Sequence, residues 1–186
     1  MYLESKIKSE SELVSHYKAA KPNSLAKEVD YLTSDYRRWI EHAPFMAVAS
    51  QGEGGLDCSP RGDKAGDLVR VLDDKTIAFP DWSGNNRLDT LRNIVNDPRI
   101  SLLFLIPGIN ESLRVIGEAF VVTDEALKQS FAVKEDIPAT VVVVDVQSVY
   151  FQCGKALKRS GLWQADTFVD AGKVPTAADM IKSASS

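Results

Sequence analysis

The chain has 186 residues, of which 44% are hydrophobic and 26% charged, so it is long enough to bury the core of one domain. Its formal net charge of −4 and its lack of a lysine or arginine block argue against general nucleic-acid binding. The two cysteines and two histidines match no zinc-site spacing, and no apolar run is long enough to cross a bilayer. The charged N-terminal residues lack the apolar stretch of a signal peptide, and we therefore expect a cytoplasmic protein.

The first part of the chain, residues 1–44, is predicted to be a helical extension. Apolar residues recur at three- and four-residue spacing across residues 24–42, and a shorter segment over residues 10–20 also reads as a helix. These two segments predict two helices, the second of which ends at Pro44. Both histidines of the chain fall in this region, where we expect them to be surface or capping residues rather than metal ligands.

From residue 45 onward, short apolar segments alternate with turns rich in glycine, proline and aspartate. The segments predicted to be strands are 45–50, 56–60, 68–72, 75–79, 100–106, 112–122 and 139–149. The segments predicted to be helices are 87–95, 125–133, 154–163 (helical or irregular) and a short tail helix after Pro175. Because most of the strands are joined by short turns, the pattern favours a mainly β protein, an antiparallel β-barrel with helices packed outside. We expect the barrel domain over residues 45–164 and a tail over residues 165–186.

The most informative motif is Gly-Asn-Asn-Arg at residues 84–87, which lies between a strand-like run and a helix-like run. A strand that turns through glycine and polar residues into a helix exposes backbone N–H groups, and these commonly bind phosphate. Arg87 would add guanidinium donors there, and a second turn at residues 59–63 carries Arg61. Two arginines on two such turns suggest a phosphorylated small molecule at a sheet edge, with Asp63 a candidate to orient Arg61. The alternative is a surface loop followed by an ordinary helix cap.

Four segments, in their order and spacing, resemble the pyridoxamine 5′-phosphate oxidase-like family of FMN-binding split barrels. They are residues 59–63, 79–99, 113–124 and 151–163, and the similarity runs from about Phe45 to Trp163. The resemblance implies an FMN-binding split β-barrel, antiparallel, that forms a homodimer with two FMN sites at the subunit interface.

The resemblance also implies cofactor-binding roles for residues in each of the four segments. The phosphate-binding positions of the family match Arg61, Asn86 and Arg87. The positions that pass the flavin ring match Ser59, Pro60, Asp81, Trp82 and Ser83. The positions on a later strand, which reaches the partner's cofactor, and at the mouth of the site match Ser112, Arg114, Lys155, Arg159 and Trp163.

A flavin carries its own redox chemistry, which fits a sequence with no nucleophile–base set, no metal cluster and no assigned catalytic residue. The chain differs from the true oxidase at its end, where residues 175–182 replace that enzyme's C-terminal pattern. The resemblance therefore does not extend to pyridoxamine phosphate as the substrate. We expect an FMN-dependent oxidoreductase acting on a small molecule. The alternatives are a non-catalytic flavin carrier and a split barrel that uses deazaflavin F420.

Overall fold

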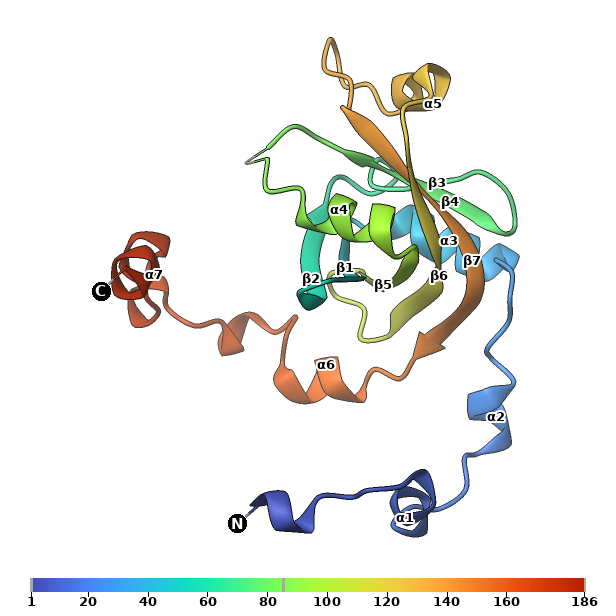
Figure 1. Cartoon of the computed structure of the whole chain (residues 1–186), viewed down its shortest axis with the longest axis vertical. Coiled ribbons are helices and arrows are strands. Elements are labelled where there is room, and N and C mark those ends of the chain that lie inside the picture. The colour runs from blue at the N-terminus through green and yellow to red at the C-terminus, as the bar shows by residue number, and fades with distance from the viewer. Residues whose placement is uncertain (1, 85, 186) are drawn as a thin grey trace.

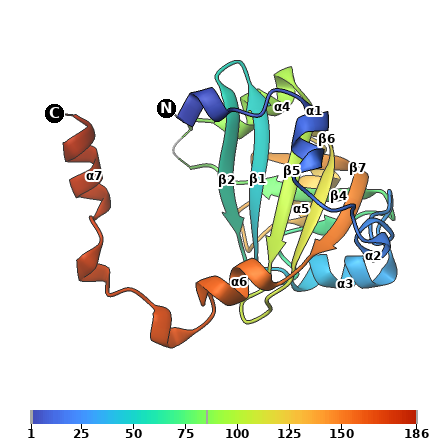
Figure 2. The same ribbon diagram turned by 90° about the horizontal axis from the view of Figure 1, so that it is seen from below.

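The computed structural model describes residues 2–84 and 86–185, so Asn85 of the predicted anion motif lies outside the described residues. Within these residues, seven strands form one antiparallel sheet in the order β2-β1-β5-β6-β7-β4-β3. Figure 2 shows the first part of this order, from β2 through β1 and β5 to β6. The strands are β1 (Phe45–Gly52), β2 (Gly55–Gly62), β3 (Arg70–Val71), β4 (Thr76–Asp81), β5 (Arg99–Leu105), β6 (Ser112–Val122) and β7 (Thr140–Gln152). Each one overlaps a segment predicted to be a strand. The predicted antiparallel sheet with peripheral helices is therefore confirmed.

One face of the curved sheet and two helices, α3 (Ser34–His42) and α4 (Asp89–Asn96), enclose the main core (Figure 1). Buried side chains alternate along β1 and β5, because successive residues of a strand point to opposite faces. The helices contribute Ile40 and Ile94 to this core. Burying a large apolar side chain stabilises a fold by roughly 1.5–3 kcal/mol. The anchoring of Ile94 fixes α4, and with it the position of the helix start.

β4 is buried on both faces, unlike the alternating strands β1 and β5. On one face, Ile77 and Phe79 belong to the main core. On the other face, Ala78 packs in a second, smaller cluster with Phe131, which directly follows the helix α5 (Glu125–Ser130). The strand is therefore buried on both sides as far as Pro80, the residue before Asp81.

The helix predicted over residues 24–42 is interrupted in the structure. A short helix, α2 (Pro22–Leu25), is followed by a segment in which Val29 pairs with Val149 of β7, with N–O distances of 3.2 and 2.8 Å. α3 begins only after Thr33, whose hydroxyl caps the helix by accepting a hydrogen bond from Tyr36 N at 3.2 Å. The prediction of one long helix was wrong because backbone pairing with the sheet outweighs local periodicity.

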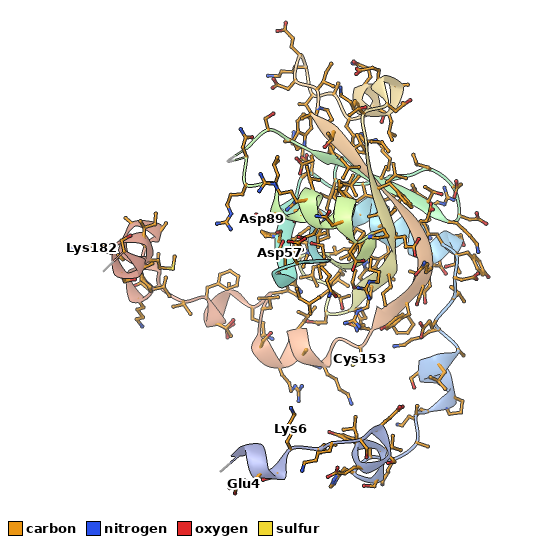
Figure 3. All side chains as sticks on the ribbon, in the orientation of Figure 1. Glu4, Lys6, Asp57, Asp89, Cys153 and Lys182 are labelled. Carbon is orange, nitrogen blue, oxygen red and sulfur yellow. The ribbon has the colours of Figure 1, made fainter. Side chains whose placement is uncertain are left out.

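Both ends of the chain extend away from the sheet, as the positions of Glu4, Lys6 and Lys182 show in Figure 3. The remaining helices are α1 (Glu10–Ser15), α6 (Lys155–Ser160), α7 (Ala177–Ala184) and the 3-10 helices Tyr2–Ser5, Ala165–Thr167 and Ala171–Lys173. α1 and α7 contain no buried residue, so of the predicted N-terminal helices α3 is the one that packs on the core. In the described part of the chain, no helix has the length and apolar character needed to cross a membrane.

The turn between α4 and β5 contains a carboxylate with a shifted pKa. The Asp97 carboxylate accepts hydrogen bonds from Arg99 Nε at 2.9 Å and from Arg99 N at 3.1 Å. These two bonds, with the charge of Arg99, lower the pKa of Asp97 from 3.8 to about 2. A carboxyl group whose pKa is lower in the folded protein than in the unfolded chain adds stability above its unfolded pKa. That added stability is lost as the pH falls.

We expect Asp97→Asn to lower the free energy of unfolding at neutral pH. The difference from the wild type should be complete above pH 3.8 and should shrink as the pH falls to about 2. Urea unfolding of both proteins at several pH values measures this difference. A difference that stays constant down to the acid limit would contradict the assignment.

Candidate functional site

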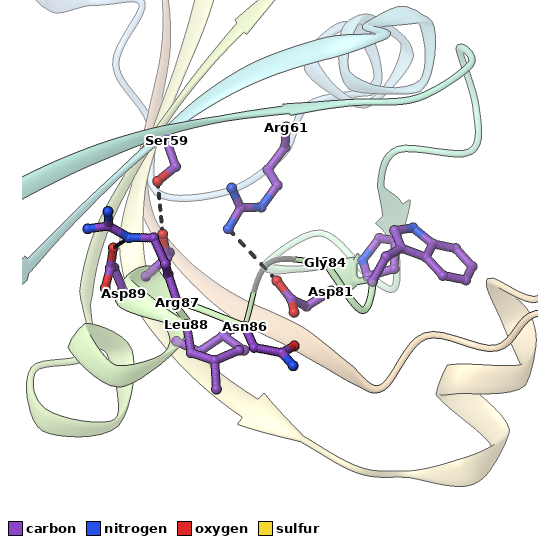
Figure 4. A pocket seen from close by; sticks show the side chains of 12 residues that line it. Ser59, Arg61, Asp81, Gly84, Asn86, Arg87, Leu88 and Asp89 are labelled. Carbon is purple, nitrogen blue, oxygen red and sulfur yellow. Dashed lines mark hydrogen bonds and ion pairs between the residues drawn. The ribbon is translucent and has the colours of Figure 1, made fainter. Parts of the chain in front are cut away.

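A pocket of about 400 Å³ lies between the edge strand β2, the end of β4 and the start of α4 (Figure 4). The residues predicted to bind a cofactor that line it are Ser59, Arg61, Asp81, Trp82, Asn86 and Arg87. The lining residues that sequence reasoning did not propose as cofactor-binding are Pro80, Gly84, Leu88, Asp89, Thr90 and Leu91. The two arginines predicted to share one anion site therefore do line the same pocket.

The side chains from β2 reach the pocket because of strand periodicity. Ser59 and Arg61 are two residues apart, so they point to the same face of the strand, and Pro60 between them points to the other face. β2 pairs with β1 and is an edge strand of the sheet, where a proline is tolerated. This arrangement explains why Pro60 does not line the pocket although its two neighbours do.

The loop from β4 to α4 has an unusual backbone at the pocket wall. Asn86 and Leu88 both have φ of 58°, the left-handed region that glycine usually occupies. α4 begins at Asp89, so Arg87 precedes the helix and does not lie in its first turn. Non-glycine residues in this conformation cost roughly 1–2 kcal/mol each. Strain of this kind is commonly found where a loop is held for a function.

Leu88→Gly is expected to raise the free energy of unfolding by about 1 kcal/mol relative to Leu88→Ala. Both variants remove an exposed side chain, but only glycine relieves the left-handed backbone. Thermal or urea unfolding of the two variants measures the strain directly. Equal stabilities would mean that the loop holds Leu88 without strain.

Each arginine in the pocket faces a carboxylate of the same pocket (Figure 4). Arg61 Nη2 lies 3.8 Å from Asp81 Oδ1, and these side chains are 24% and 17% exposed. Arg87 Nε donates a hydrogen bond of 2.8 Å to Asp89 Oδ2, with side chains 75% and 46% exposed. Burial raises the pKa of Asp81, and the charge of Arg61 opposes that shift.

The predicted partner of Arg61 was wrong. Asp63 was expected to orient this guanidinium, but its carboxylate accepts a hydrogen bond of 2.7 Å from the backbone N–H of Lys64. The acidic residue that pairs with Arg61 is Asp81, which lies twenty residues after Arg61 in the chain. Arg61 Nη1 also donates to the carbonyl oxygen of Pro60 at 2.9 Å.

A cluster of two hydroxyls and a carboxylate joins β2 to α4. Asp57 Oδ2 lies 3.2 Å from Ser59 Oγ and 3.3 Å from Thr90 Oγ1, and the two hydroxyl oxygens are 3.2 Å apart. Thr90 is 4% exposed, so this contact is largely shielded from water at the wall of the pocket. Sequence analysis placed Asp57 in the strand predicted over residues 56–60 and gave it no role in the site. Asp57, Ser59 and Arg61 alternate along the strand at intervals of two residues, and this spacing was the signal that Asp57 shares the face of the other two.

The other predicted site residues do not line this pocket. They are Pro60, Ser83, Ser112, Arg114, Lys155, Arg159 and Trp163. Arg114 on β6 donates to the Tyr150 hydroxyl at 3.1 Å, and Trp163 Nε1 donates to the Ile109 carbonyl at 2.8 Å. Lys155 and Arg159 lie on α6, beyond the far end of β7 (Figure 1). Their cofactor roles stay predictions.

Among the described residues, no group of histidine, cysteine, aspartate and glutamate side chains could hold a metal ion. The pocket instead contains guanidinium and amide donors, hydroxyls, and the apolar surfaces of Trp82, Leu88 and Leu91. Such a mixture suits an organic ligand with an anionic end, and the volume lies within the usual range for small-ligand sites.

Comparison with known structures identifies the same fold. A variant of HupZ from Group A Streptococcus is 21% identical, with a TM-score of 0.54 over 65% of this chain and 99% of that chain. A candidate pyridoxamine 5′-phosphate oxidase from Lactobacillus delbrueckii is 18% identical, with a TM-score of 0.51 over 66% of this chain and 95% of that one. None of the curated proteins compared with the chain matches it.

The sequence profile described as Pyridoxamine 5′-phosphate oxidase matches residues 32–153, which is more than half of the chain. The matched range contains all seven strands and every described residue that lines the pocket. Members of this family commonly bind flavins. The chain therefore belongs to the pyridoxamine 5′-phosphate oxidase-like family and has its split-barrel fold.

Proposed function

We propose that this protein binds FMN in the pocket between β2, β4 and α4 and acts as an FMN-dependent oxidoreductase on a small molecule. The observation that carries the proposal is that Arg61, Arg87 and the start of α4 meet at one pocket. Guanidinium groups and the free N–H groups of a helix start are the donors that bind phosphate best in proteins.

The residues of the pocket are suited to different parts of FMN. Arg61, Arg87 and the Asn86 amide are suited to the phosphate, and the hydroxyls of Ser59 and Thr90 to the ribityl chain. Trp82 and Leu88 offer apolar surface for part of the ring. When bound, FMN supplies hydride and electron transfer, so the work of this chain is to bind the cofactor, orient it and exclude water.

We also propose that the active form is a homodimer. The proposal rests on the resemblance, and it is supported by the five predicted cofactor-binding residues on β6, α6 and the segment after α6 that lie outside the pocket of their own chain. A second copy could bring these residues to the open side of the pocket. Light scattering of the flavin-loaded protein tests this, and a monomer with one tightly bound FMN per chain would contradict it.

Titration of the flavin-free protein with FMN and with riboflavin tests the cofactor assignment. FMN should bind more tightly than riboflavin, because the two differ only in the phosphate. Binding of F420 without binding of FMN would mean that the cofactor is F420 instead of FMN.

Anaerobic addition of NADH or NADPH to the FMN-loaded protein then tests for turnover, since reduction of the flavin supports an oxidoreductase. A flavin that neither these nor other small-molecule donors reduce would favour a carrier.

A further inference from the structure

A carboxylate of the same chain lies beside Arg61, where the phosphate of a ligand would bind. Asp81 Oδ1 lies 3.8 Å from Arg61 Nη2, within ion-pair range but too far for a hydrogen bond. Both groups line the pocket and come from different strands, β2 and β4. The pair is therefore held by charge alone, without the directional bond that would fix it.

The two ion pairs of the pocket differ in how much water stabilises them. Arg87 and Asp89 are largely exposed and directly hydrogen-bonded, so water and each other both stabilise their charges. Arg61 and Asp81 are mostly shielded from water, and burial raises the pKa of Asp81 despite the arginine. The ionised form of Asp81 consequently depends on Arg61 more than Asp89 depends on Arg87.

An anion bound to Arg61 would sit close to Asp81 and repel it. The charged groups that line the pocket around Asp81 are Arg61 from β2, Arg87 from the loop and Asp89 from α4. Thr140 of β7 lies directly opposite Asp81 in the sheet, so its side chain points to the same face. The Thr140 hydroxyl is buried and has no hydrogen-bond partner in the described part of the chain. It is therefore an unpaired polar group on the same face of the sheet as Asp81.

We propose that Asp81 is the residue that sets anion selectivity in this pocket. Its carboxylate competes with the ligand phosphate for Arg61, and Asp81 takes up one proton from solvent when the phosphate binds. This inference rests on the proposed binding of FMN and extends it, because it makes the affinity for a phosphomonoester depend on pH through a residue of the protein. A neutral ligand that does not bind Arg61 does not compete with the Asp81 carboxylate.

The test compares FMN and riboflavin binding by wild type and Asp81→Asn at several pH values. At about pH 8, the variant should bind FMN at least about tenfold more tightly than the wild type, while riboflavin binding changes little. As the pH falls and Asp81 becomes protonated in the free protein, the affinity of the wild type for FMN should approach that of the variant. Any pH dependence that the variant also shows comes from the phosphate group. Calorimetry in two buffers of different ionisation enthalpy should detect proton uptake by the wild type and not by the variant.

Two further variants serve as matched controls, because each removes one negative charge. Asp89→Asn changes the exposed pair of the same pocket and should strengthen FMN binding by about threefold or less. Asp30→Asn changes an exposed ion pair with Lys75 outside the pocket and should leave FMN binding unchanged. An Asp81→Asn variant that binds FMN no more tightly than wild type would overturn this proposal alone. Equal affinity of the wild type for FMN and riboflavin, or no flavin binding at all, would overturn the proposed function as well.

Discussion

Replacing Arg61 with alanine is expected to weaken FMN binding by about 100-fold while the protein remains folded. A hydrogen bond to a charged group contributes about 1.5–3 kcal/mol, which corresponds to roughly tenfold to more than 100-fold in affinity. The variant loses this contact and also leaves Asp81 in the pocket without its ion-pair partner. Fluorescence titration with FMN and riboflavin measures the loss, and riboflavin binding should change much less.

A smaller loss of FMN binding is expected from the other arginine of the pocket, Arg87. Arg87 is 75% exposed and Arg61 is 24% exposed, so water screens the charge of Arg87 more strongly. Arg87→Ala should therefore weaken FMN binding by about tenfold, less than Arg61→Ala. Arg38→Ala, at an exposed position on α3 outside the pocket, controls for the loss of one positive charge. Equal losses for FMN and riboflavin in Arg61→Ala would exclude Arg61 from a phosphate site.

Gly117→Ala is expected to destabilise the protein by about 3 kcal/mol or more, because there is no room for a side chain. A Cβ atom at this position would lie 2.1 Å from the carbonyl oxygen of Asp145 and 3.0 Å from its carbonyl carbon. Both of these are backbone atoms of β7, and they sit where the β6–β7 register shifts between Ile116 and Gly117. The clash can be relieved only by separating the two long strands.

Thermal unfolding measures the effect, and a loss of that size lowers Tm by roughly 6–12 °C in a domain of this length. Gly54→Ala is the matched control, because a Cβ atom at Gly54 would meet no atom within 4 Å. That substitution should change stability by about 0.5 kcal/mol or less. An unchanged Tm for Gly117→Ala would mean that β6 and β7 pair differently from the register described here.

The strands could be predicted from the sequence because their signal is local. The predicted and observed bounds of β6 are the same, residues 112–122. Turn-forming residues before the strand and helix-capping residues after it mark its two ends. The break in the helix predicted over residues 24–42 could not be predicted, because it depends on Val149, far along the chain. Local periodicity carries no information about such a partner.

The candidate site was likewise predicted in part from the sequence. Arg61, Asn86 and Arg87 were proposed from two short motifs, and all three line the pocket. Asp81 was proposed as a site residue beside the flavin ring but not as the partner of Arg61, and Asp89 was not proposed. The acidic partner first proposed for Arg61, Asp63, was the wrong one. A motif names the groups that could bind an anion, but it does not say which other charges of the protein share the space.

The sequence by itself determined the strand pattern, the helix-start motif and the resemblance to a flavin-binding family, because each of these depends on residues close together in the chain. Only the tertiary structure decided that Asp81 faces Arg61 and that Thr90 meets Asp57 and Ser59. These contacts form when the edge strand β2, the end of β4 and the start of α4 are brought together around the pocket. That placement follows from burial of the two-sided strand β4 and of Ile94, so it is a consequence of packing the whole core.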